Sequence, residues 1–565
     1  MTTDKSAEKG RRLRPALFGL STFLLIVIVG FPVLAIIMFA LFPYINELSF
    51  REPFNVLLPN LSNPRLIEAT LNSLSLSFAV TILSAVIAVP LAYMRARFPL
   101  RLGRIWDACY LVPFLIPPYI GSLAWMQLLQ RKGFIEQWLG FNMADFLFSF
   151  PGIVTVMALH LFPLIYFTTS NAFAIIGSRY GDVAKVFGGR PVQVFFRIYL
   201  PMVLPALLSS SLIVFILTIE EFGTPEILGS RFGYEVIVTS IHEKFSDWPI
   251  DLPGASVLSL ILIFIAFFAF QAHQKLSDKF QTTVENQTID RRGEPLPPVY
   301  LAIVILIFGS IFVLAVVLPI VTVGIAAFMD TVSGGVTADN MSFKNLLGLF
   351  DRESEAWGAI LTSLSLAVMA AIGTVVIAII VAFTIVRLRS AATVFLDFLA
   401  ILPNSVPGMA VAVGLILTWN QPWWPVTPYN TPLILLLAYL CLMLPYPIRM
   451  VTAALRQLPK SLDDAAYISG ASELVVIRQV LAPLLLPIAL AAGFIVFAIS
   501  TRELVSSIML APAGVETVAT YVFHQFDQVS VGSGMAMSLV AILVSGSIIA
   551  FGQKLQGKNR TGDGS

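Results

Sequence analysis

Four charged residues close otherwise apolar stretches, where ionisable side chains are rare. Glu220 and Glu221 end one stretch, and Arg502 and Glu503 end another. An ionised side chain at the centre of a bilayer costs about 2.5–3.5 kcal/mol on insertion scales, so such groups usually face a cavity or an opposite charge. The functional interpretation of these residues is therefore that they belong to a pathway or gate. The structural alternative is an ion pair between Arg502 and Glu220 or Glu221.

A second pattern of residues occurs twice. It consists of an acid, one or two small residues, a Gly six positions after the acid and a Pro nineteen positions after it. Its members are Asp182, Ala184, Gly188 and Pro201 in the first copy, and Asp464, Ala465, Ala466, Gly470 and Pro483 in the second. The copies lie 282 residues apart in a chain of 565. This spacing indicates a duplicated protein with a similar polar loop in each half.

Catalytic and metal-binding patterns are not found beside these charges. Residues 552–559 approach a phosphate-binding loop, but Asn559 stands where Ser or Thr would hold Mg²⁺. The cysteines and histidines show no metal-ligand spacing. They are Cys109, Cys441, His160, His242, His273 and His524. We therefore expect no enzyme activity, no metal site and no cofactor bound by this chain. A transient metal contact by His242 or His524 is the weaker alternative.

The composition predicts an all-α polytopic membrane protein. Hydrophobic residues make up 57% of the chain and charged residues 12%, about half the charge of a soluble domain. Apolar runs long enough for the roughly 20 helical residues that cross a bilayer recur twelve times. They lie at 17–42, 71–94, 108–129, 153–174, 198–219, 255–272, 299–329, 359–386, 398–419, 432–448, 480–501 and 532–551. Membrane lipid is the expected environment, and nucleic acid is not an expected partner.

The basic residues predict the orientation of these spans. Lys and Arg concentrate in cytoplasmic loops. With the N-terminus inside, the inner segments carry 26 of the 35 basic residues. We therefore expect both termini and both copies of the repeated loop to be cytoplasmic. The first apolar run is longer than a cleavable signal core, so we expect a retained helix.

The repeat extends through most of the chain in one direction. An offset of 290 relates Asp107 to Asp397 and Pro113 to Pro403, and an offset of 282 relates Glu221 to Glu503. Each repeat contains six spans, and an even number of crossings returns the chain to the side of the membrane where it began. The two six-helix repeats are therefore parallel. In each repeated loop, the acid and small residues predict a short helix. The Gly predicts a sharp bend, and the Pro predicts the first turn of the next helix. Ser461 and Asp464 also have the spacing of a capping box.

The repeated loop resembles the EAA loop of binding-protein-dependent ABC importer permeases, which reads Glu-Ala-Ala, then Gly, then a hydrophobic stretch ending in Leu-Pro. Here Asp replaces Glu in both copies, Val183 replaces the first Ala, and Ala482 replaces the final Leu of the second copy. The resemblance implies the type I ABC importer permease fold, with each loop a coupling helix seated on a cytoplasmic ATPase subunit. Two ATPase subunits would use ATP and Mg, and a periplasmic binding protein would deliver the substrate.

The fused twelve-span layout and the segments around Glu220 and Glu503 look most like ferric iron permeases. This implies iron transport across a bacterial inner membrane. Permeases for thiamine, a phosphonate compound or polyamine share the layout and remain alternatives, and an ion-coupled secondary transporter is the alternative of a different class.

The expected divisions are 1–69, the N-terminus, first helix and periplasmic loop; 70–272, the first permease domain; 273–298, a cytoplasmic linker; 299–358, the seventh helix and periplasmic loop; 359–553, the second permease domain; and 554–565, a cytoplasmic tail.

Overall fold

The described part of the chain is built from helices. The computed structural model describes residues 15–98, 100, 103–177, 179–284, 297–388, 391–527 and 530–560. Within these residues, extended segments pair only through an isolated bridge between Met329 and Met341. The predicted all-α fold class is therefore confirmed. Residues 1–14, residues 285–296 of the expected linker and residues 561–565 of the expected tail lie outside the described residues.

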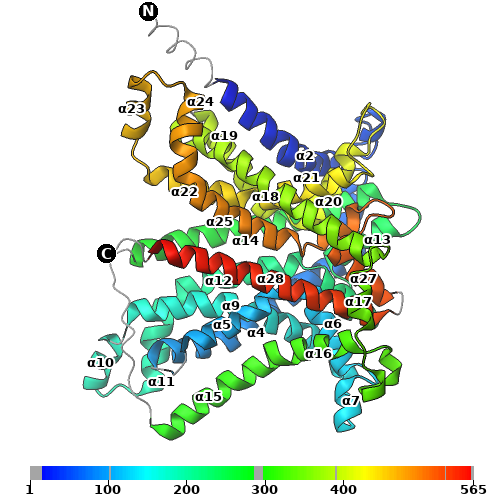
Figure 1. Cartoon of the computed structure of the whole chain (residues 1–565), viewed down its shortest axis with the longest axis vertical. Coiled ribbons are helices and arrows are strands. Elements are labelled where there is room, and N and C mark those ends of the chain that lie inside the picture. Colours follow the sequence, from blue (N-terminus) through cyan, green and yellow to red (C-terminus); the bar gives the residue numbers. More distant parts are fainter. Residues whose placement is uncertain are drawn as a thin grey trace, which may run out of the picture.

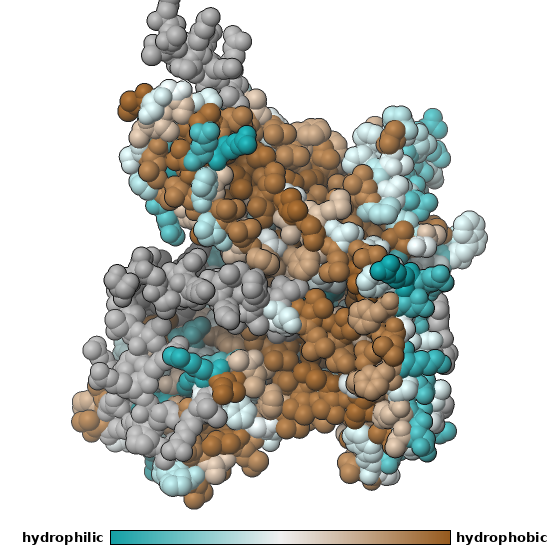
Figure 2. Space-filling view, viewed as in Figure 1, coloured by the Kyte–Doolittle hydropathy of each residue, from teal (hydrophilic) through white to brown (hydrophobic). Residues whose placement is uncertain are grey.

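Eight described helices are long and apolar enough to cross a membrane. They are Pro15–Leu41, which ends in α2 (Phe31–Leu41); α4 (Pro64–Arg97); α9 (Phe150–Ile176); Pro191–Glu220, which ends in α12 (Leu200–Glu220); Leu252–Ser277, the first part of α14 (Leu252–Val284); Pro298–Phe328, which joins α15 (Pro298–Phe312) to α16 (Leu318–Phe328); α18 (Glu355–Arg387); and Glu473–Ser500, which ends in α25 (Ala482–Ser500). Apolar side chains cover the middle of the molecular surface (Figure 2). The chain is therefore a multi-pass membrane protein.

Three pairs of helices joined at a bend meet the length and composition test when each pair is taken together, as a broken span or a re-entrant loop. They are α5 (Gly103–Leu115) with α6 (Pro118–Leu129), α19 (Ala391–Ile401) with α20 (Gly408–Trp419), and α21 (Pro432–Met443) with α22 (Pro445–Gln457). The bends are 92°, 115° and 44°. Proline and glycine interrupt the apolar runs predicted at 108–129 and 398–419, and the structure shows that the chain bends within these runs and within 432–448. Pro117, Pro407 and Pro445 lie at the breaks, where the ring removes a backbone donor and clashes with the preceding turn.

The last predicted span lies in α28 (Val531–Arg560). The apolar helix in its described part is Val531–Ser547, which is shorter than the other spans. The described residues thus contain up to eleven spans by length and composition, together with this shorter helix. Residues 552–559 also belong to α28, so the stretch that approaches a phosphate-binding loop is helical.

The first helix of each repeat packs against helices of both repeats. Within each repeat the second span forms a central contact: α4 packs against α9 and α12, and α18 packs against α22 and α25. The first helix of each repeat also contacts a helix of the other repeat. In the first repeat, α2 packs against α20, and Gly414 of α20 comes so close that a Cβ would lie 2.5 Å from the Pro32 carbonyl oxygen. In the second repeat, α16 packs against α6. The halves are therefore interlocked.

A buried serine in each repeat fixes the loop that follows the fifth span. The Ser73 hydroxyl accepts a hydrogen bond from the Ile237 amide at 2.8 Å, at the start of α13 (Ile237–Ser246). The Ser363 hydroxyl accepts one from the Val518 amide, also at 2.8 Å, at the start of α27 (Val518–Asp527). The repeat visible in the sequence is thus reproduced in individual hydrogen bonds.

The two repeated loops lie on one side of the molecule. They contain α10 (Arg179–Val186) and α23 (Ser461–Ile468), which Figure 1 shows at the same end of the helical bundle and well separated from each other. The opposite end carries α7 (Phe134–Leu139), α17 (Lys344–Gly348) and α27, and hydrophilic residues gather there in Figure 2. A parallel repeat requires this arrangement, because each repeat then presents its loop to the same side.

Candidate functional site

Each repeated loop is a short helix closed by a glycine in the left-handed region. In the first loop, Gly188 has φ +77° and the Gly189 amide donates to the Ala184 carbonyl at 2.8 Å. In the second loop, Gly470 has φ +82° and the Ala471 amide donates to the Ala466 carbonyl at 3.0 Å. This is the geometry that glycine accepts at a helix C-terminus. The bends predicted at both glycines are present.

The prolines of the pattern lie where the membrane helices resume. Pro201 is the second residue of α12, and Pro483 is the second residue of α25. A π-helical turn precedes each of them, at Phe195–Tyr199 and Val476–Leu481. Proline suits a first helical turn because the amide it lacks would have no partner there.

The second loop presents part of its pattern to solvent. Asp464 and Ala465 are exposed, and Ala466 is half-buried. In the first loop Ala184 is half-buried, whereas the side chain of Asp182 lies outside the described residues. The capping box predicted from Ser461 is not formed. Lys460 occupies the N-cap position of α23 and makes no side-chain cap.

An acid that the pattern omits anchors the second loop. Asp463 is buried, and its Oδ2 lies 2.7 Å from Nε of Arg387 at the end of α18. The Arg387 guanidinium also donates to the Leu458 carbonyl at 3.2 Å. Burial raises the pKa of Asp463, and the charge of Arg387 opposes that change. The sequence feature that could have indicated this anchor is Arg387, because the offset of 290 relates it to Arg97 in the first repeat.

Large apolar side chains project from the tips of both loops. Val186 and Phe187 are 83% and 85% exposed in the first loop, and Ile468 is 89% exposed in the second. The offset of 282 relates Val186 to Ile468, so the same position of each repeat is apolar and uncovered. Exposed apolar groups outside the membrane commonly mark a protein interaction site.

A cavity of about 960 Å³ lies where the two repeats meet. Its lining is largely apolar and comes from the third to sixth spans of the first repeat and from the first, third, fourth and fifth spans of the second. The polar residues of the lining are Tyr119, His160, Glu220, Glu221, Thr224, His273, Asn404, Tyr446, Arg502 and Glu503. All four charged residues selected from the sequence therefore meet at one cavity. The sequence did not indicate that Tyr119, His160 and Tyr446 belong to this site, because they lie within apolar spans.

Two of the three glutamates bind the backbone that follows them. Both carboxylate oxygens of Glu221 accept from the Thr224 amide, at 2.9 and 3.0 Å. The carboxylate of Glu503 accepts from the Ser506 amide at 3.0 Å and from the Ser507 amide at 3.2 Å. The offset of 282 relates Glu221 to Glu503 and Thr224 to Ser506. These glutamates therefore cap the turn by which the chain leaves the fifth span of each repeat.

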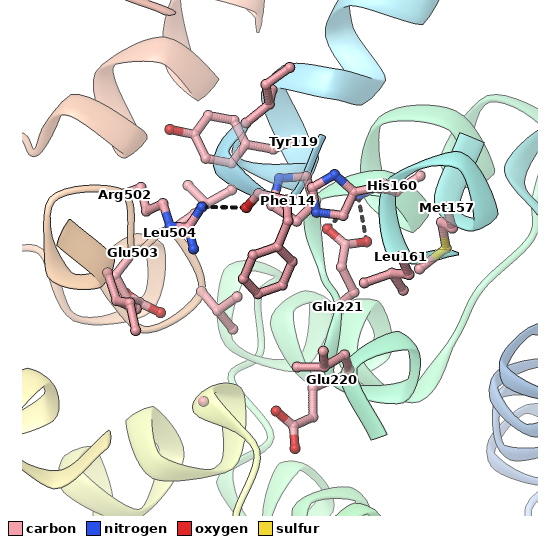
Figure 3. Close-up of a pocket in the computed structure, with 18 of the residues that line it drawn as sticks. Phe114, Tyr119, Met157, His160, Leu161, Glu220, Glu221, Arg502, Glu503 and Leu504 are labelled. Atoms are coloured by element: carbon pink, nitrogen blue, oxygen red, sulfur yellow. Dashed lines mark hydrogen bonds between the residues drawn. The ribbon is translucent and has the colours of Figure 1, made fainter. Parts of the chain in front are cut away.

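Arg502 reaches from the second repeat to the first. One of its guanidinium nitrogens donates to the Phe114 carbonyl at 2.8 Å, and the guanidinium carbon lies 5.7 Å from the centre of the Phe114 ring (Figure 3). That carbonyl belongs to α5 just before its break. Among the described residues, the ion pair that the sequence suggests with Glu220 or Glu221 is not formed. Glu220 extends away from Glu221, with no hydrogen bond drawn to it in Figure 3.

Two of the four histidines line the cavity, and the other two contact a nearby side chain. His160 and His273 line the cavity, and the His242 ring packs 5.0 Å from the Phe222 ring. His524 Nδ1 lies 3.0 Å from Glu516 Oε1. No group of three or more His, Cys, Asp or Glu side chains among the described residues is arranged to hold a metal ion.

Comparison with known proteins agrees with this arrangement. Residues 86–281 and 374–559 each match the family described as binding-protein-dependent transport system inner membrane component. The chain is 28% identical to the ferric transport system permease protein FbpB of Actinobacillus pleuropneumoniae over 498 residues, which cover 86% of this chain and 71% of that protein. It is 29% identical to the putative ferric transport system permease protein FbpB 1 of Haemophilus influenzae over 442 residues, which cover 76% of this chain and 68% of that protein. It is also 30% identical to the molybdenum transport system permease protein ModB of Mycobacterium tuberculosis over 236 residues, which cover 42% of this chain and 88% of that protein. The chain therefore belongs to the binding-protein-dependent transport system inner membrane component family, and it contains two copies of the family's domain.

Proposed function

We propose that this chain is the membrane subunit of an ATP-driven importer and contains both halves of the translocation pathway. The observation that carries the proposal is the placement of α10 and α23. They lie at one end of the bundle with exposed apolar tips, while the cavity lies where the repeats meet. Two cytoplasmic ATPase subunits bind these helices, hydrolyse ATP with Mg, and change the access to the cavity. The chain itself is not an enzyme and binds no cofactor.

The loops are attached to the membrane helices in a way that suits force transmission. Asp463 joins α23 to the end of α18 through Arg387. In the first repeat, the Tyr199 hydroxyl accepts from the Gly181 amide at 3.2 Å and donates to the Gly177 carbonyl at 3.3 Å. Tyr199 ends the π-helical turn that leads into α12, so α10 is bonded to the base of the fifth span. A displacement of the first loop is therefore passed to the fifth span, which lines the cavity, and a displacement of the second loop is passed to α18, which packs against the cavity-lining α25.

Ferric iron is the proposed cargo, delivered from the periplasm by a binding protein. Two supports are independent of each other: relatives that cover most of the chain are named as ferric permeases, and the cavity lining contains three carboxylates and one guanidinium. Oxygen ligands suit hard cations. The protein would lie in a bacterial inner membrane with both termini cytoplasmic. Thiamine, a phosphonate compound or polyamine is the alternative cargo, and ion-coupled secondary transport is the alternative mechanism.

The test is reconstitution of the full chain with its ATPase subunits in proteoliposomes. Loaded binding proteins for ferric iron, thiamine, an aminophosphonate and a polyamine are added in turn, and ATP hydrolysis is measured. The proposal predicts stimulation by the ferric protein. Stimulation by one of the others alone would overturn the iron assignment, and hydrolysis unchanged by all four would contradict the importer mechanism.

A further inference from the structure

We propose that Glu220 is the residue that contacts the cargo in the cavity, and that this contact selects a positively charged cargo over an anionic one. The inference rests on the proposed role as an importer but does not require the cargo to be iron. It divides the four charged residues at the cavity into three that hold the protein together and one that is available to a ligand.

The hydrogen bonds of the cavity separate Glu220 from the other charged groups. The carboxylates of Glu221 and Glu503 accept backbone amides, and the Arg502 guanidinium donates to the Phe114 carbonyl. Glu220 lines the same cavity, and no described residue forms a hydrogen bond or ion pair with its carboxylate. An acid in a membrane protein usually faces a partner or a water-filled pathway. The geometry therefore leaves Glu220 as the acid that faces the pathway.

The repeat makes this position asymmetric. The offset of 282 that relates Glu221 to Glu503 also relates Glu220 to Arg502. The capping acid is thus preserved in both halves, while the residue before it is negative in one half and positive in the other. Because Arg502 is bonded to the first repeat, its charge is directed to the Phe114 carbonyl. Of the three carboxylates in the lining, that of Glu220 alone forms no hydrogen bond with a described residue. It therefore gives the pathway one negative contact.

A second group in the lining points to a ligand. Tyr119 is 2% exposed, lines the cavity, and has a buried hydroxyl without a hydrogen-bond partner among the described residues. A buried polar group normally has such a partner. The phenol of Tyr446 and the amide of Asn404 add oxygen atoms to the same lining. A carboxylate and neutral oxygen donors in the lining of one cavity suit a hard cation and disfavour an oxyanion.

The cargo class follows from this charge. Relatives that match 42% and 48% of the chain are named for molybdenum and sulfate transport, so the family's fold does not determine the sign of the cargo's charge. Glu220 would repel such oxyanions in the cavity between the two repeats. We therefore assign Glu220 as a specificity-determining residue for a multivalent cation.

Site-resolved labelling tests this assignment without knowledge of the natural cargo. The full-length permease in lipid nanodiscs is treated with a membrane-permeant carbodiimide, and modified carboxyls are mapped by mass spectrometry with and without terbium(III), a hard trivalent probe. We expect Glu220 to be labelled and terbium(III) to reduce its labelling at least fivefold, while molybdate has no effect. Glu221 and Glu503 should react much less. Absence of labelling at Glu220, no protection by terbium(III), or protection by molybdate would overturn the proposal.

Transport gives the second readout. In proteoliposomes with the ATPase subunits and a ferric binding protein, Glu220→Gln should lower uptake of radioactive ferric iron at least tenfold. Glu220→Asp should restore part of the uptake. Glu47→Gln, which changes an exposed acid outside the cavity, is the matched control. Wild-type uptake by Glu220→Gln would overturn the proposal. If the wild-type protein imports no iron yet terbium(III) protects Glu220, the iron assignment fails and the cation contact stands.

Discussion

Glu220 and Arg502 occupy the same position of the two repeats, 282 residues apart, and carry opposite charges. Both line the cavity where the repeats meet, yet they do not pair with each other. Arg502 instead binds the Phe114 carbonyl of the opposite repeat at 2.8 Å. Duplication produced two equivalent positions, and one of them now connects the halves while the other faces the pathway.

Loss of the Arg502 contact should weaken the association of the two repeats. Arg502→Gln removes a charge-assisted hydrogen bond, which is worth about 1.5–3 kcal/mol of unfolding free energy. Thermal unfolding of the solubilised permease would measure the change. The matched control is Arg449→Gln. Arg449 lies 3.4 Å from Asp397 and is 40% exposed, so its removal should cost about 1 kcal/mol or less. Equal losses in the two variants would contradict the assigned role of Arg502.

The capping glutamates should matter for stability in both repeats. Glu503→Ala leaves the Ser506 and Ser507 amides without their acceptor, and Glu221→Ala does the same to Thr224. Loss of a side-chain cap costs about 0.5–2 kcal/mol. We expect each variant to lower the unfolding temperature, whereas Glu220→Ala should not. A Glu220→Ala protein that is the least stable of the three would mean that Glu220 has a structural partner.

The anchor of the second loop should be needed for coupling. Asp463→Asn removes one partner of a buried ion pair and leaves Arg387 without its counter-charge, a change that costs about 3 kcal/mol where burial is complete. The expected result is increased protease cleavage in 461–470 and lower stimulation of ATP hydrolysis by the binding protein. Asp464→Asn changes an exposed neighbour and should leave cleavage unchanged. Identical cleavage of the two variants would exclude an anchoring role for Asp463.

The glycine that closes each loop should be required for its backbone conformation. At Gly470 a Cβ would meet no atom within 4 Å, so the effect of a substitution comes from φ alone. Gly470→Val places a side chain in the left-handed region at a cost of about 1–2 kcal/mol, whereas Asn tolerates that region. Stimulated ATP hydrolysis should fall in Gly470→Val and be largely kept in Gly470→Asn. Gly309→Ala, in a membrane helix with equally open surroundings, is the control. Full activity of Gly470→Val would contradict this requirement.

The fold and the position of the loops could be predicted because each follows from a strong local signal. Apolar runs identify spans, and the offset between Asp182 and Asp464 identifies the repeat. The breaks at Pro117 and Pro407 were harder to predict, because a proline in a membrane helix can produce a mild kink or a complete bend. The difference depends on the helices packed around it.

The site was predictable in its charged residues and not in their roles. Glu220, Glu221 and Glu503 look alike in the sequence, since each is an acid at the end of an apolar stretch. Hydrogen bonds to amides three or four residues later distinguish the two capping acids, and these depend on the turn that follows. The anchor Asp463 was missed because Asp464 satisfied the repeated spacing. Tyr119 and His160 were missed because a cavity joins segments far apart in the chain.

The most direct measurement is uptake of radioactive ferric iron into proteoliposomes that contain the full chain, with and without the ATPase subunits. A loaded ferric binding protein is present outside and ATP is enclosed with the cytoplasmic face. We predict uptake that requires both the ATPase subunits and ATP, and that falls together with stimulated hydrolysis in an Ile468→Asp variant of the exposed loop tip. Uptake driven by an imposed ion gradient in vesicles without the ATPase subunits would contradict the proposed mechanism.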